Sequence, residues 1–494
     1  MTKRIRKLVV LLLSLLLIVL ASSICYGADY YVDPAQGNDN NAGSLSKPWK
    51  SIYKSSRILA PGDTLYLRAG KYINDVFVAV RSGTQEMPIT IKAYPGEEPK
   101  IVSEGSHGAV IFMLNAKWYV VDGIAFEDCA ASAGTIVIIS SSNIVIRNSS
   151  FVRSKGTPVK LRTSSYITVE GSTFIEHGDP GGQGGGDHIA VQGSSNNIIR
   201  SNYFSKAGHY AILLMNFQDT YSKYNQIISN RIEQYWGGGI NIVLGSEYNL
   251  IEGNVISHVG DMVLTYPKTG IQLTASNNTV RKNIIHTTAR GNTAIYFGAY
   301  EYQSIVQHCQ NNLVYNNTLY NIGGSGFYFA QKGKAVNANN RIVNNLIYKA
   351  AQEGPYKGSG LPKLHYYLWF DTYHSVSNWD AFPNGNIFQN NWLQSNGSVA
   401  YVKKAGAQAG QWGNPMSWVQ TNYHSNFMNN YISDAAPKFK NEKNNDFTLK
   451  MGTPLINKGV VVDDVNGRMG GWANLKYCGK APDIGAREVC KKTQ

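Results

Sequence analysis

Five consecutive loops of this sequence carry side chains suited to acid–base chemistry. Histidine, lysine and tyrosine exchange protons when their surroundings tune them, and a carboxylate orients a histidine or binds a cation. Irregular segments on a rigid scaffold are common places for such residues. The residues concerned are His177, Asp179, Asp187 and His188; Lys206 and His209; Glu233, Tyr235 and Trp236; His258, Asp261 and Lys268; and His286 and Arg290.

One reaction within reach of these residue types is β-elimination on a uronate. The substrate carboxylate must be neutralised, a base must remove the adjacent proton, and an acid must protonate the leaving oxygen. We assign His209 as the base, Tyr296 as the acid, and Lys268 and Arg290 as the carboxylate binders. Asp187 would orient His209 or bind a cation. An epimerase would need the same groups and would return the proton on the other face of the sugar.

A glycoside hydrolase would instead need two carboxylates across the scissile bond. Asp187 and Glu233 form the best such pair in the sequence. Structural interpretations stay open beside these roles. Asp187 follows three glycines and could end its loop through side-chain-to-backbone hydrogen bonds, and Trp236 could be packing rather than a sugar platform.

An internal repeat must position these loops. Its pattern is an asparagine, alternating apolar residues, and a second asparagine five places after the first. The copies lie at Asn143/Asn148, Asn197/Asn202, Asn225/Asn230, Asn249/Asn254, Asn278/Asn283, Asn312/Asn317, Asn340/Asn345 and Asn386/Asn391, with degenerate copies at Trp118/Gly123 and Tyr166/Gly171. Between Trp118 and Asn340 the copies follow one another at 23 to 34 residues, a period typical of solenoids.

The repeat units are strand-like and cannot bury their apolar faces alone, so neighbouring units must stack. An asparagine at a corner tolerates left-handed backbone angles, and stacked asparagines can hydrogen-bond as a ladder. A leucine-rich repeat is excluded because no leucine consensus and no helical stretch recur. The sequence therefore predicts an all-β fold, a right-handed parallel β-helix.

A second strand is expected after each asparagine-bounded strand, and alternation assigns its faces. The expected strands are Thr135–Ile139, Pro158–Arg162, His188–Gln192, Tyr210–Leu214, Gly239–Val243, Gly270–Thr274, Ala294–Gly298 and Gly326–Ala330. The inward column is Ile136/Ile138, Val159/Leu161, Ile189/Val191, Ala211/Leu213, Ile240/Ile242, Ile271/Leu273, Ile295/Phe297 and Phe327/Phe329. The outward column is Lys160, Arg162, His188, Gln192, Tyr210, Asn241, Gln272, Thr274, Tyr296 and Tyr328.

The outward column is expected to form one long exposed stripe along the stack. Residues expected to bind substrate there or at its edge are Lys160, Arg162, His188, Gln192, Trp236, Asn241, Lys268, Gln272 and Arg290. For Lys160, Arg162 and His188, a merely solvated surface is the open alternative.

The two ends of the stack need covering. Residues 47–62 are expected to form a short amphipathic helix that plugs the N-terminal end. Its inward residues would be Trp49, Ile52, Tyr53 and Leu59. Residues 351–430 are rich in Tyr and Trp with weak repeat character, which favours irregular outer coils or an insertion. Exposed rings there could stack on sugars, although packing is the default.

The stretch Tyr30–Tyr72 resembles the N-terminal cap of pectate-lyase-like right-handed β-helix proteins, and Asn444–Gly459 with Pro482–Glu488 is similar to their closing segment. The resemblance covers nearly the whole mature chain and implies this fold and a polysaccharide partner. Calcium-dependent pectate lyases of this type carry clustered aspartates around an Asp-Asp pair followed by Gly, and the central coils lack such a cluster. We therefore transfer no catalytic residue and no metal ligand, and a Ca²⁺ cofactor stays open without recognisable ligands.

The N-terminus has the layout of a cleavable signal peptide. Basic residues precede the apolar run Leu8–Leu20, and Cys25-Tyr26-Gly27 offers small residues for a cut after Gly27. The run is short for a membrane span of about 20 residues, and no later segment is apolar enough. We therefore expect a secreted or periplasmic protein that does not insert into a membrane once cleaved.

Net charge and cysteine usage limit the classes of partner and metal site that the sequence is compatible with. Cleavage lowers the formal net charge from +14 to +10, because four basic and no acidic residues leave. Such a surface attracts anionic polymers or simply aids solubility; without a Lys/Arg-rich run or nucleic-acid motif, we expect no nucleic acid. Cys478 and Cys490 could form a disulfide in an oxidising compartment, while Cys129 and Cys309 should be buried. No Cys/His metal spacing occurs.

The expected organisation is a signal peptide (1–27), an N-terminal cap with the first coils (28–100), the parallel β-helix (101–350), an irregular region (351–430) and a closing segment (431–494), in a monomer. The expected function is action on a long anionic polysaccharide, by lyase-type β-elimination in preference. The alternatives are a non-catalytic glycan-binding surface or matrix protein, and a glycoside hydrolase or uronate epimerase on the same fold.

Overall fold

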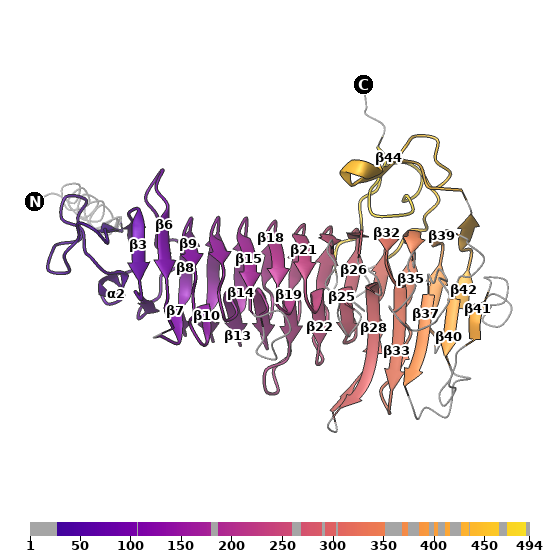
Figure 1. Cartoon of the computed structure of the whole chain (residues 1–494), viewed down its shortest axis with the longest axis horizontal. Helices are drawn as coiled ribbons and strands as arrows, with labels where there is room; N and C mark the ends of the chain where they lie inside the picture. The colour runs from indigo at the N-terminus through magenta and orange to yellow at the C-terminus, as the bar shows by residue number, and fades with distance from the viewer. Residues whose placement is uncertain are drawn as a thin grey trace, which may run out of the picture.

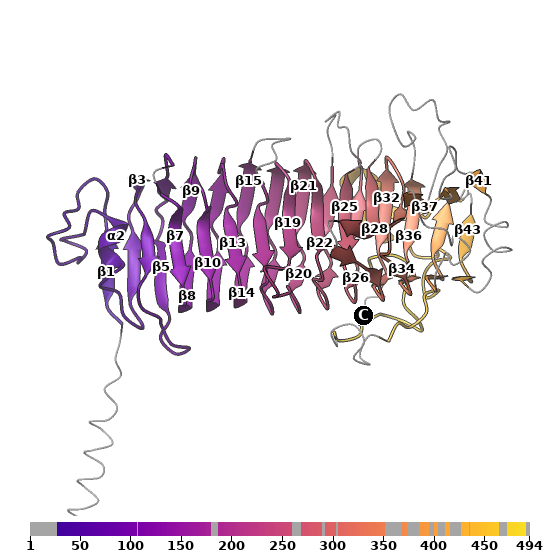
Figure 2. The same cartoon turned by 90° about the horizontal axis from the view of Figure 1, so that it is seen from below.

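The computed structural model is a long stack of short strands that wind around one axis (Figures 1 and 2). It describes residues 27–105, 107–178, 186–258, 268–288, 292–302, 305–350, 368–373, 385–394, 400–403, 411–414, 426–433, 435–463 and 472–490. The predicted signal peptide, apart from Gly27, lies outside these ranges. Within them, no helix has the length and apolar character needed to cross a membrane.

Three parallel sheets run the length of the stack, and each coil gives one strand to each sheet. Sheet 1 holds β1 Asp29–Val32, β2 Thr64–Leu67, β5 Ile89–Ala93, β8 Lys117–Asp122, β11 Ser142–Arg147, β14 Ser165–Glu170, β17 Ile198–Arg200, β20 Gln226–Ile228, β23 Leu250–Glu252, β26 Thr279–Arg281, β31 Leu313–Tyr315, β35 Arg341–Val343, β38 Ile387–Gln389 and β42 Phe427–Met428.

Sheet 2 follows sheet 1 within each coil after a short turn. It holds β3 Gly70–Ile73, β6 Pro99–Val102, β9 Ala125–Glu127, β12 Ser150–Val152, β15 Thr173–His177, β18 Tyr203–Ala207, β21 Arg231–Tyr235, β24 Val255–Ser257, β27 Ile284–His286, β32 Thr318–Ile322, β36 Leu346–Ala350, β39 Trp392–Gln394 and β43 Tyr431–Ser433.

Sheet 3 completes the coil. It holds β4 Phe77–Ala79, β7 Ala109–Leu114, β10 Gly134–Ile139, β13 Val159–Arg162, β16 Ile189–Gln192, β19 Tyr210–Met215, β22 Gly238–Val243, β25 Thr269–Thr274, β28 Thr293–Tyr302, β33 Phe327–Lys332, β37 Leu368–Tyr373, β40 Ala400–Lys403 and β41 Gln411–Asn414. Two strands depart from the parallel order: β41 pairs antiparallel with β40, and β29 Ile305–Gln307 folds back antiparallel on β28. β30 Cys309–Gln310 pairs with β34 Asn337–Ala338.

The parallel register confirms the predicted fold and most of the predicted inward column. Ile136, Val159, Ile189, Ile212, Ile240, Ile271, Ile295 and Phe327 follow one another as direct partners on successive strands of sheet 3. All are buried in one continuous core. Phenylalanines of sheet 2 add stacked rings to this core, for example Phe151 and Phe174, whose ring centroids lie 4.7 Å apart.

At β19 the predicted faces are wrong. Ile212 and Leu214, not Ala211 and Leu213, are the partners of Ile189 and Val191, and Leu213 belongs to the outer column. The cause is at the start of the strand, where Ala211 also lies inside the core. Two consecutive residues therefore face inward after the turn, and strict alternation applied from Tyr210 misses this irregularity.

Two asparagine ladders hold the short turns on either side of sheet 1. In the ladder that includes Asn202, Asn230 and Asn254, each Nδ2 donates to the next Oδ1 at 3.0–3.1 Å. The other ladder includes Asn197 and Asn225, which are joined at 2.9 Å. Because each amide binds the coils above and below it, the ladders fix the vertical spacing of the stack.

The ladder asparagines do not themselves adopt the left-handed conformation predicted for them. That conformation falls on the residue before each one: Ser201 (φ 55°) precedes Asn202 and Ser229 (φ 55°) precedes Asn230. The earlier copy at Asn143/Asn148 is shifted by one residue, since both of its asparagines have positive φ (58° and 50°). The repeat thus combines two separate roles, a buried amide and a left-handed corner.

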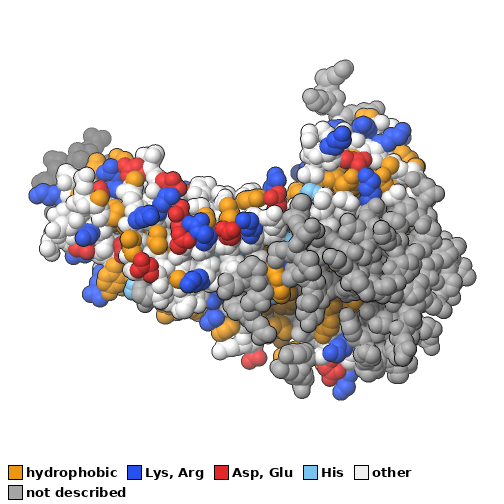
Figure 3. Space-filling view, in the orientation of Figure 1, with side chains coloured by type: hydrophobic (Ala, Val, Ile, Leu, Met, Phe, Trp, Pro, Cys, Tyr) orange, Lys and Arg blue, Asp and Glu red, His pale blue; other side chains and the backbone are white. Residues whose placement is uncertain are grey.

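Ion pairs between neighbouring coils line the outer side of sheet 1 near its strand ends. The column runs Asp122, Arg147, Glu170 and Arg200, and then Glu252 and Arg281. Within it, Arg147 pairs with Asp122 at 2.9 Å, Arg200 with Glu170 at 2.6 Å and Arg281 with Glu252 at 2.8 Å. In Figure 3, acidic and basic side chains lie side by side along the N-terminal coils. Much of the surface charge is therefore neutralised locally.

The N-terminal helix is much shorter than predicted. Only α2 Ile52–Ser55 is α-helical, with Ser51 as its N-cap. Trp49, Ile52 and Leu59 are buried in the core as expected, but Tyr53 is exposed and the prediction for it is wrong.

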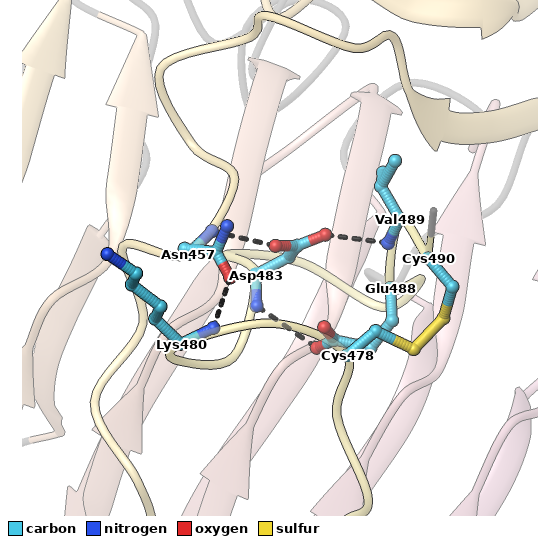
Figure 4. Close-up of a disulfide and its surroundings, with 7 residues drawn as sticks. All are labelled: Asn457, Cys478, Lys480, Asp483, Glu488, Val489 and Cys490. Atoms are coloured by element: carbon cyan, nitrogen blue, oxygen red, sulfur yellow. Dashed lines mark hydrogen bonds between the residues drawn. A yellow bond between two sulfur atoms is a disulfide. The ribbon is translucent and has the colours of Figure 1, made fainter. Parts of the chain in front are cut away.

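The C-terminal segment folds back beside the later coils (yellow in Figure 1), where β44 Phe439–Asn441 and β45 Asp446–Leu449 flank the 3₁₀ turn η3 Glu442–Asn444. Cys478 and Cys490 form a disulfide (Figure 4). Next to it Asp483 accepts hydrogen bonds from the backbone of Asn457 and Val489 at 2.8 and 2.7 Å. Cys129 and Cys309 are buried free thiols, as predicted.

Candidate active site

A cluster of chemically active side chains lies where the chain turns from sheet 2 into sheet 3. Asp187, His209, Trp236 and Lys268 each come one or two residues before a sheet 3 strand (β16, β19, β22 and β25). Successive strands of a sheet are separated by about 4.8 Å, so these residues follow one another along one edge of the sheet. We call Asp187, His209, Tyr210, Trp236 and Lys268 the edge cluster.

A histidine–aspartate pair is the centre of the edge cluster. Nδ1 of His209 lies 2.9 Å from Oδ1 of Asp187, and the same oxygen accepts the backbone N–H of Tyr210 at 3.1 Å. Because a carboxylate only accepts, the neutral imidazole carries its proton on Nδ1 and a lone pair on Nε2. About a third of the His209 side chain is exposed, whereas Asp187 is buried. The arrangement supplies an oriented proton acceptor.

Two glycines, Gly237 and Gly238, allow the next coil to pack closely against the edge cluster. The backbone N–H groups of Gly237 and Gly238 donate to the carbonyl of His209 at 2.8 and 3.3 Å. A Cβ at Gly237 would lie 3.0 Å from Cδ2 of His209, and one at Gly238 would lie 3.0 Å from the ring of Tyr210. The next coil therefore packs its bare backbone directly against both rings.

Two ammonium groups lie along sheet 3 on either side of the pair, Lys160 on β13 and Lys268 just before β25. Nζ of Lys268 is 5.1 Å from the centroid of the Trp236 ring and has no hydrogen-bond acceptor among the described residues. Burial lowers the pKa of Lys268 to about 8. Lys160, which donates to the carbonyl of Ala133, has a pKa lowered chiefly by burial and then by Arg162, while Asp187 opposes the shift. A desolvated ammonium gains by pairing with an anion.

Tyr210 is a member of the edge cluster that the predicted catalytic set omitted. Its ring lies 3.9 Å from that of His209, centroid to centroid. Burial, and then the charge of Asp187, raise its pKa to about 12, so the phenol keeps its proton at neutral pH. Strand alternation predicted that Tyr210 faces outward, but no sequence pattern indicated its contact with His209.

His188 does not bind solvent or substrate, so its predicted role is wrong. It is 0% exposed and lies in the core, 5.6 Å from the ring of Phe204 and 4.5 Å from that of His177, which is also buried. Burial lowers the pKa of His188 well below its usual value and that of His177 to about 3. The prediction failed because two consecutive residues, His188 and Ile189, face inward where the chain enters β16, just as Ala211 and Ile212 do at the start of β19.

The predicted long exposed stripe is also wrong, because much of the outer column is buried. Asn241, Tyr296 and Tyr328 are 4%, 8% and 6% exposed. Tyr296 packs against Tyr328 in an aromatic cluster. It lies three strands beyond β19, about 14 Å along the sheet, so it cannot serve as the acid opposite His209.

Other predicted binding residues on the outer column are partly exposed but held by their neighbours. Arg162 donates to Oε1 of Gln192 at 3.1 Å and lies 4.3 Å from the Phe217 ring centroid. Gln272 is half-buried and is the direct strand partner of Asn241. These residues flank the edge cluster without joining it.

Glu233 belongs to a different surface. It lies within β21 of sheet 2, where its carboxylate accepts from Arg231 at 2.6 Å and from the hydroxyl of Tyr203 at 3.0 Å. The structure therefore does not bring Glu233 to Asp187 as the carboxylate pair of a hydrolase. Arg290, Asp179 and Asp261 lie outside the described residues.

A calcium site does not emerge from the described ranges. There, no three His, Cys, Asp or Glu side chains gather as a metal centre. Oδ1 of Asp187 already accepts from His209 and Tyr210. The described residues therefore do not form a set of ligands that fits a calcium ion.

Two family models match the sequence. One, described as a Pel9A-like right-handed β-helix region, matches residues 30–255, and one described as a right-handed β-helix region matches residues 217–310. An uncharacterised protein of Bacillus subtilis, YwoF, is 24% identical over 86% of this chain and 92% of its own length.

A lacto-N-biosidase of Bifidobacterium longum is 39% identical over 98 residues, which are 18% of this chain and only 6% of that enzyme. The crystal structure of pectate lyase Pel9A overlaps 95% of this chain and 98% of its own, with 16% identity and a TM-score of 0.49. Both matched family models describe a right-handed β-helix region, and together with the parallel three-sheet coil they show that the chain is a pectate-lyase-like right-handed parallel β-helix.

Proposed function

We propose that this protein is a secreted enzyme that cleaves a long anionic polysaccharide by β-elimination at the edge cluster. The observation that carries the proposal is the His209–Asp187 pair, joined at 2.9 Å, with the ring of Tyr210 against that of His209. The family model and the local match to a glycan-cleaving enzyme support a carbohydrate substrate. The signal-peptide layout of residues 1–27 supports export.

In the proposed reaction His209 is the base. Its Nε2 takes the proton next to the uronate carboxylate, and Asp187 stabilises the imidazolium that forms. The electron pair released forms the new carbon–carbon double bond as the bond to the leaving oxygen breaks. Tyr210 gives its proton to that oxygen, a role that suits a phenol with a pKa of about 12.

The substrate carboxylate would be bound by Lys268, a partly dehydrated cation whose pairing with a uronate would restore the interactions that burial removes. Lys160 comes from β13, four strands from β25 and about 19 Å away along sheet 3, so it would bind the carboxylate of another sugar of the polymer. Neutralising the carboxylate also makes the adjacent proton easier to remove. Trp236 beside Lys268 would contact the sugar ring or keep water from the ammonium.

The test is an assay of the full mature chain on polygalacturonate, alginate and chondroitin sulfate, with unsaturated uronate followed by its ultraviolet absorbance. We expect product from at least one polymer and a loss of at least 100-fold in His209→Ala. His107→Ala is the matched control and should keep full activity, because His107 bonds to the backbone of Asn74 on an early coil, far from the edge cluster.

Two results would contradict the proposal. Binding of these polymers without any product, in a protein whose circular dichroism shows it folded, would favour the non-catalytic glycan binder. New reducing ends without ultraviolet absorbance would favour a hydrolase.

A further inference from the structure

A second hollow lies at the opposite ends of the same sheet 3 strands. It has a volume of about 460 Å³, and its lining includes Tyr221, Lys223, Glu247, Ile305, Val306 and His308 together with several amide side chains. We call it the far groove. β19, β22 and β25 have six residues each, so the far groove lies about 20 Å from the edge cluster.

One wall of the far groove is an exposed tyrosine ring. Tyr221 is 45% exposed, although a large apolar ring normally gains by burial. A Cβ at Gly245 would lie 2.7 Å from this ring, so the ring packs on bare glycine backbone. One face of the ring is thereby fixed, and the ring remains largely accessible to a ligand.

Another wall comes from β29 of the antiparallel β28–β29 hairpin, which contributes Ile305 and Val306 to the lining. Ile305 and Val306 are exposed there at 55% and 37%. Exposed apolar side chains facing an exposed aromatic ring across a hollow suit a ligand with an apolar face.

The charged side chains that line the far groove form an ion pair with each other. Lys223 pairs with Glu247 at 3.5 Å and lies 5.2 Å from the ring centroid of Tyr221. Nδ1 of His308 accepts the backbone N–H of Val336 at 3.1 Å, so in the neutral ring Nε2 carries the proton and can donate. The remaining polar lining side chains are amides and a hydroxyl, which both donate and accept. The groove thus offers no unbalanced cation for a carboxylate or sulfate.

From these observations we infer that the far groove binds a neutral pyranose of an oligosaccharide. The C–H face of the sugar lies on Tyr221, its edge contacts Ile305 and Val306, and its hydroxyls bond to the amides of residues such as Asn216 and Gln310. The volume falls within the usual range of about 300–1,000 Å³ for small-ligand sites. This site does not depend on the reaction proposed above.

The experiment titrates the full mature chain with cellotetraose, mannotetraose, galactotetraose, xylotetraose and trigalacturonate, followed by calorimetry and saturation-transfer NMR. We expect at least one neutral tetraose to bind with a dissociation constant in the millimolar range or tighter. Tyr221→Ala should weaken that binding at least tenfold, because it removes the stacking surface.

Tyr166→Ala is the matched control, since Tyr166 is also an exposed tyrosine (59%) but lies on an earlier coil away from the groove. It should leave binding unchanged, and so should His209→Ala at the edge cluster. The inference is overturned if no neutral tetraose binds, if Tyr221→Ala binds it as tightly as the wild type, or if only trigalacturonate binding depends on Tyr221.

Discussion

The asparagine ladders allow a sharp test of what stabilises the stack. Oδ1 of Asn230 accepts both the backbone N–H and Nδ2 of Asn202, at 3.0 and 3.1 Å, and its own Nδ2 donates to the carbonyl of Ile199 and to Asn254. Asn230 is 1% exposed, so water cannot replace these partners. The change to examine is Asn230→Ala.

The expected loss follows from the donors left without an acceptor. Asn230→Ala orphans the N–H of Asn202 and one of its side-chain N–H groups, and each buried unsatisfied group costs about 1–3 kcal/mol. The free energy of unfolding should therefore fall by roughly 2–6 kcal/mol. Urea denaturation followed by circular dichroism measures the total, and hydrogen exchange of the peptide containing Asn202 measures the local opening.

The neighbouring residue provides the control. Ser229 has φ 55°, and glycine accepts that conformation without strain but adds freedom to the unfolded chain, so Ser229→Gly should change stability by less than about 1 kcal/mol. If Asn230→Ala were as mild as Ser229→Gly, the asparagines would not be stabilising the stack through their amides and the reasoning would fail.

Two further changes probe the edge cluster and the core. Gly237→Ala should lower the rate of polymer cleavage at least tenfold with little change in circular dichroism, because the new Cβ would lie 3.0 Å from Cδ2 of His209; unchanged kinetics would show that Gly237 does not set the position of the ring. Acid should also destabilise the fold. His177 has a pKa of about 3, and His258 and His286 have values of about 4, all lowered mainly by burial. Above pH 6.5 both folded and unfolded states hold these rings neutral; below it only the unfolded state gains protons, at a cost of about 1.4 kcal/mol per pH unit for each ring. Glu488, whose pKa burial raises to about 7, has the opposite effect, because the folded state holds its proton more tightly than the unfolded state does. Its contribution is that of one group against three histidines. Urea denaturation should therefore show lower stability at pH 5 than at pH 7, and equal stability at both would contradict the placement of the histidines.

The fold could be predicted because it follows from periodicity. Repeats such as Asn225/Asn230 and Asn249/Asn254, together with alternating strands, give both the period of the coil and the face that each side chain occupies. The predictions that failed concern the orientation or backbone conformation of individual residues. Alternation cannot show that two residues in a row face inward at the start of a strand, and this placed His188 and Leu213 on the wrong side. The sequence also cannot distinguish a ladder asparagine from one at a left-handed corner, because both are favourable places for Asn.

The candidate site was predicted in part. Asp187 and His209 are 22 residues apart, close to one coil, which is why a stacking argument brings them together. Tyr296 was placed on the same outer column, but a column shared along a stack does not mean contact. Direct partners are about 4.8 Å apart and residues three coils away about 14 Å apart. The groups that act on one sugar ring must therefore come from a few adjacent coils, and this is why Tyr210, next to His209, replaces Tyr296 in the proposed reaction.

Net charge is a poor guide to where an anionic polymer would bind this protein. The formal charge of +14 suggests a broadly attractive surface, yet arginines such as Arg147 and Arg200 pair with acids of neighbouring coils. Exposed pairs of this kind present little net field to a ligand. Lys268 differs because it is buried and its Nζ has no hydrogen-bond acceptor among the described residues. A single dehydrated ammonium beside a proton acceptor thus favours a uronate at the edge cluster more than the total charge does.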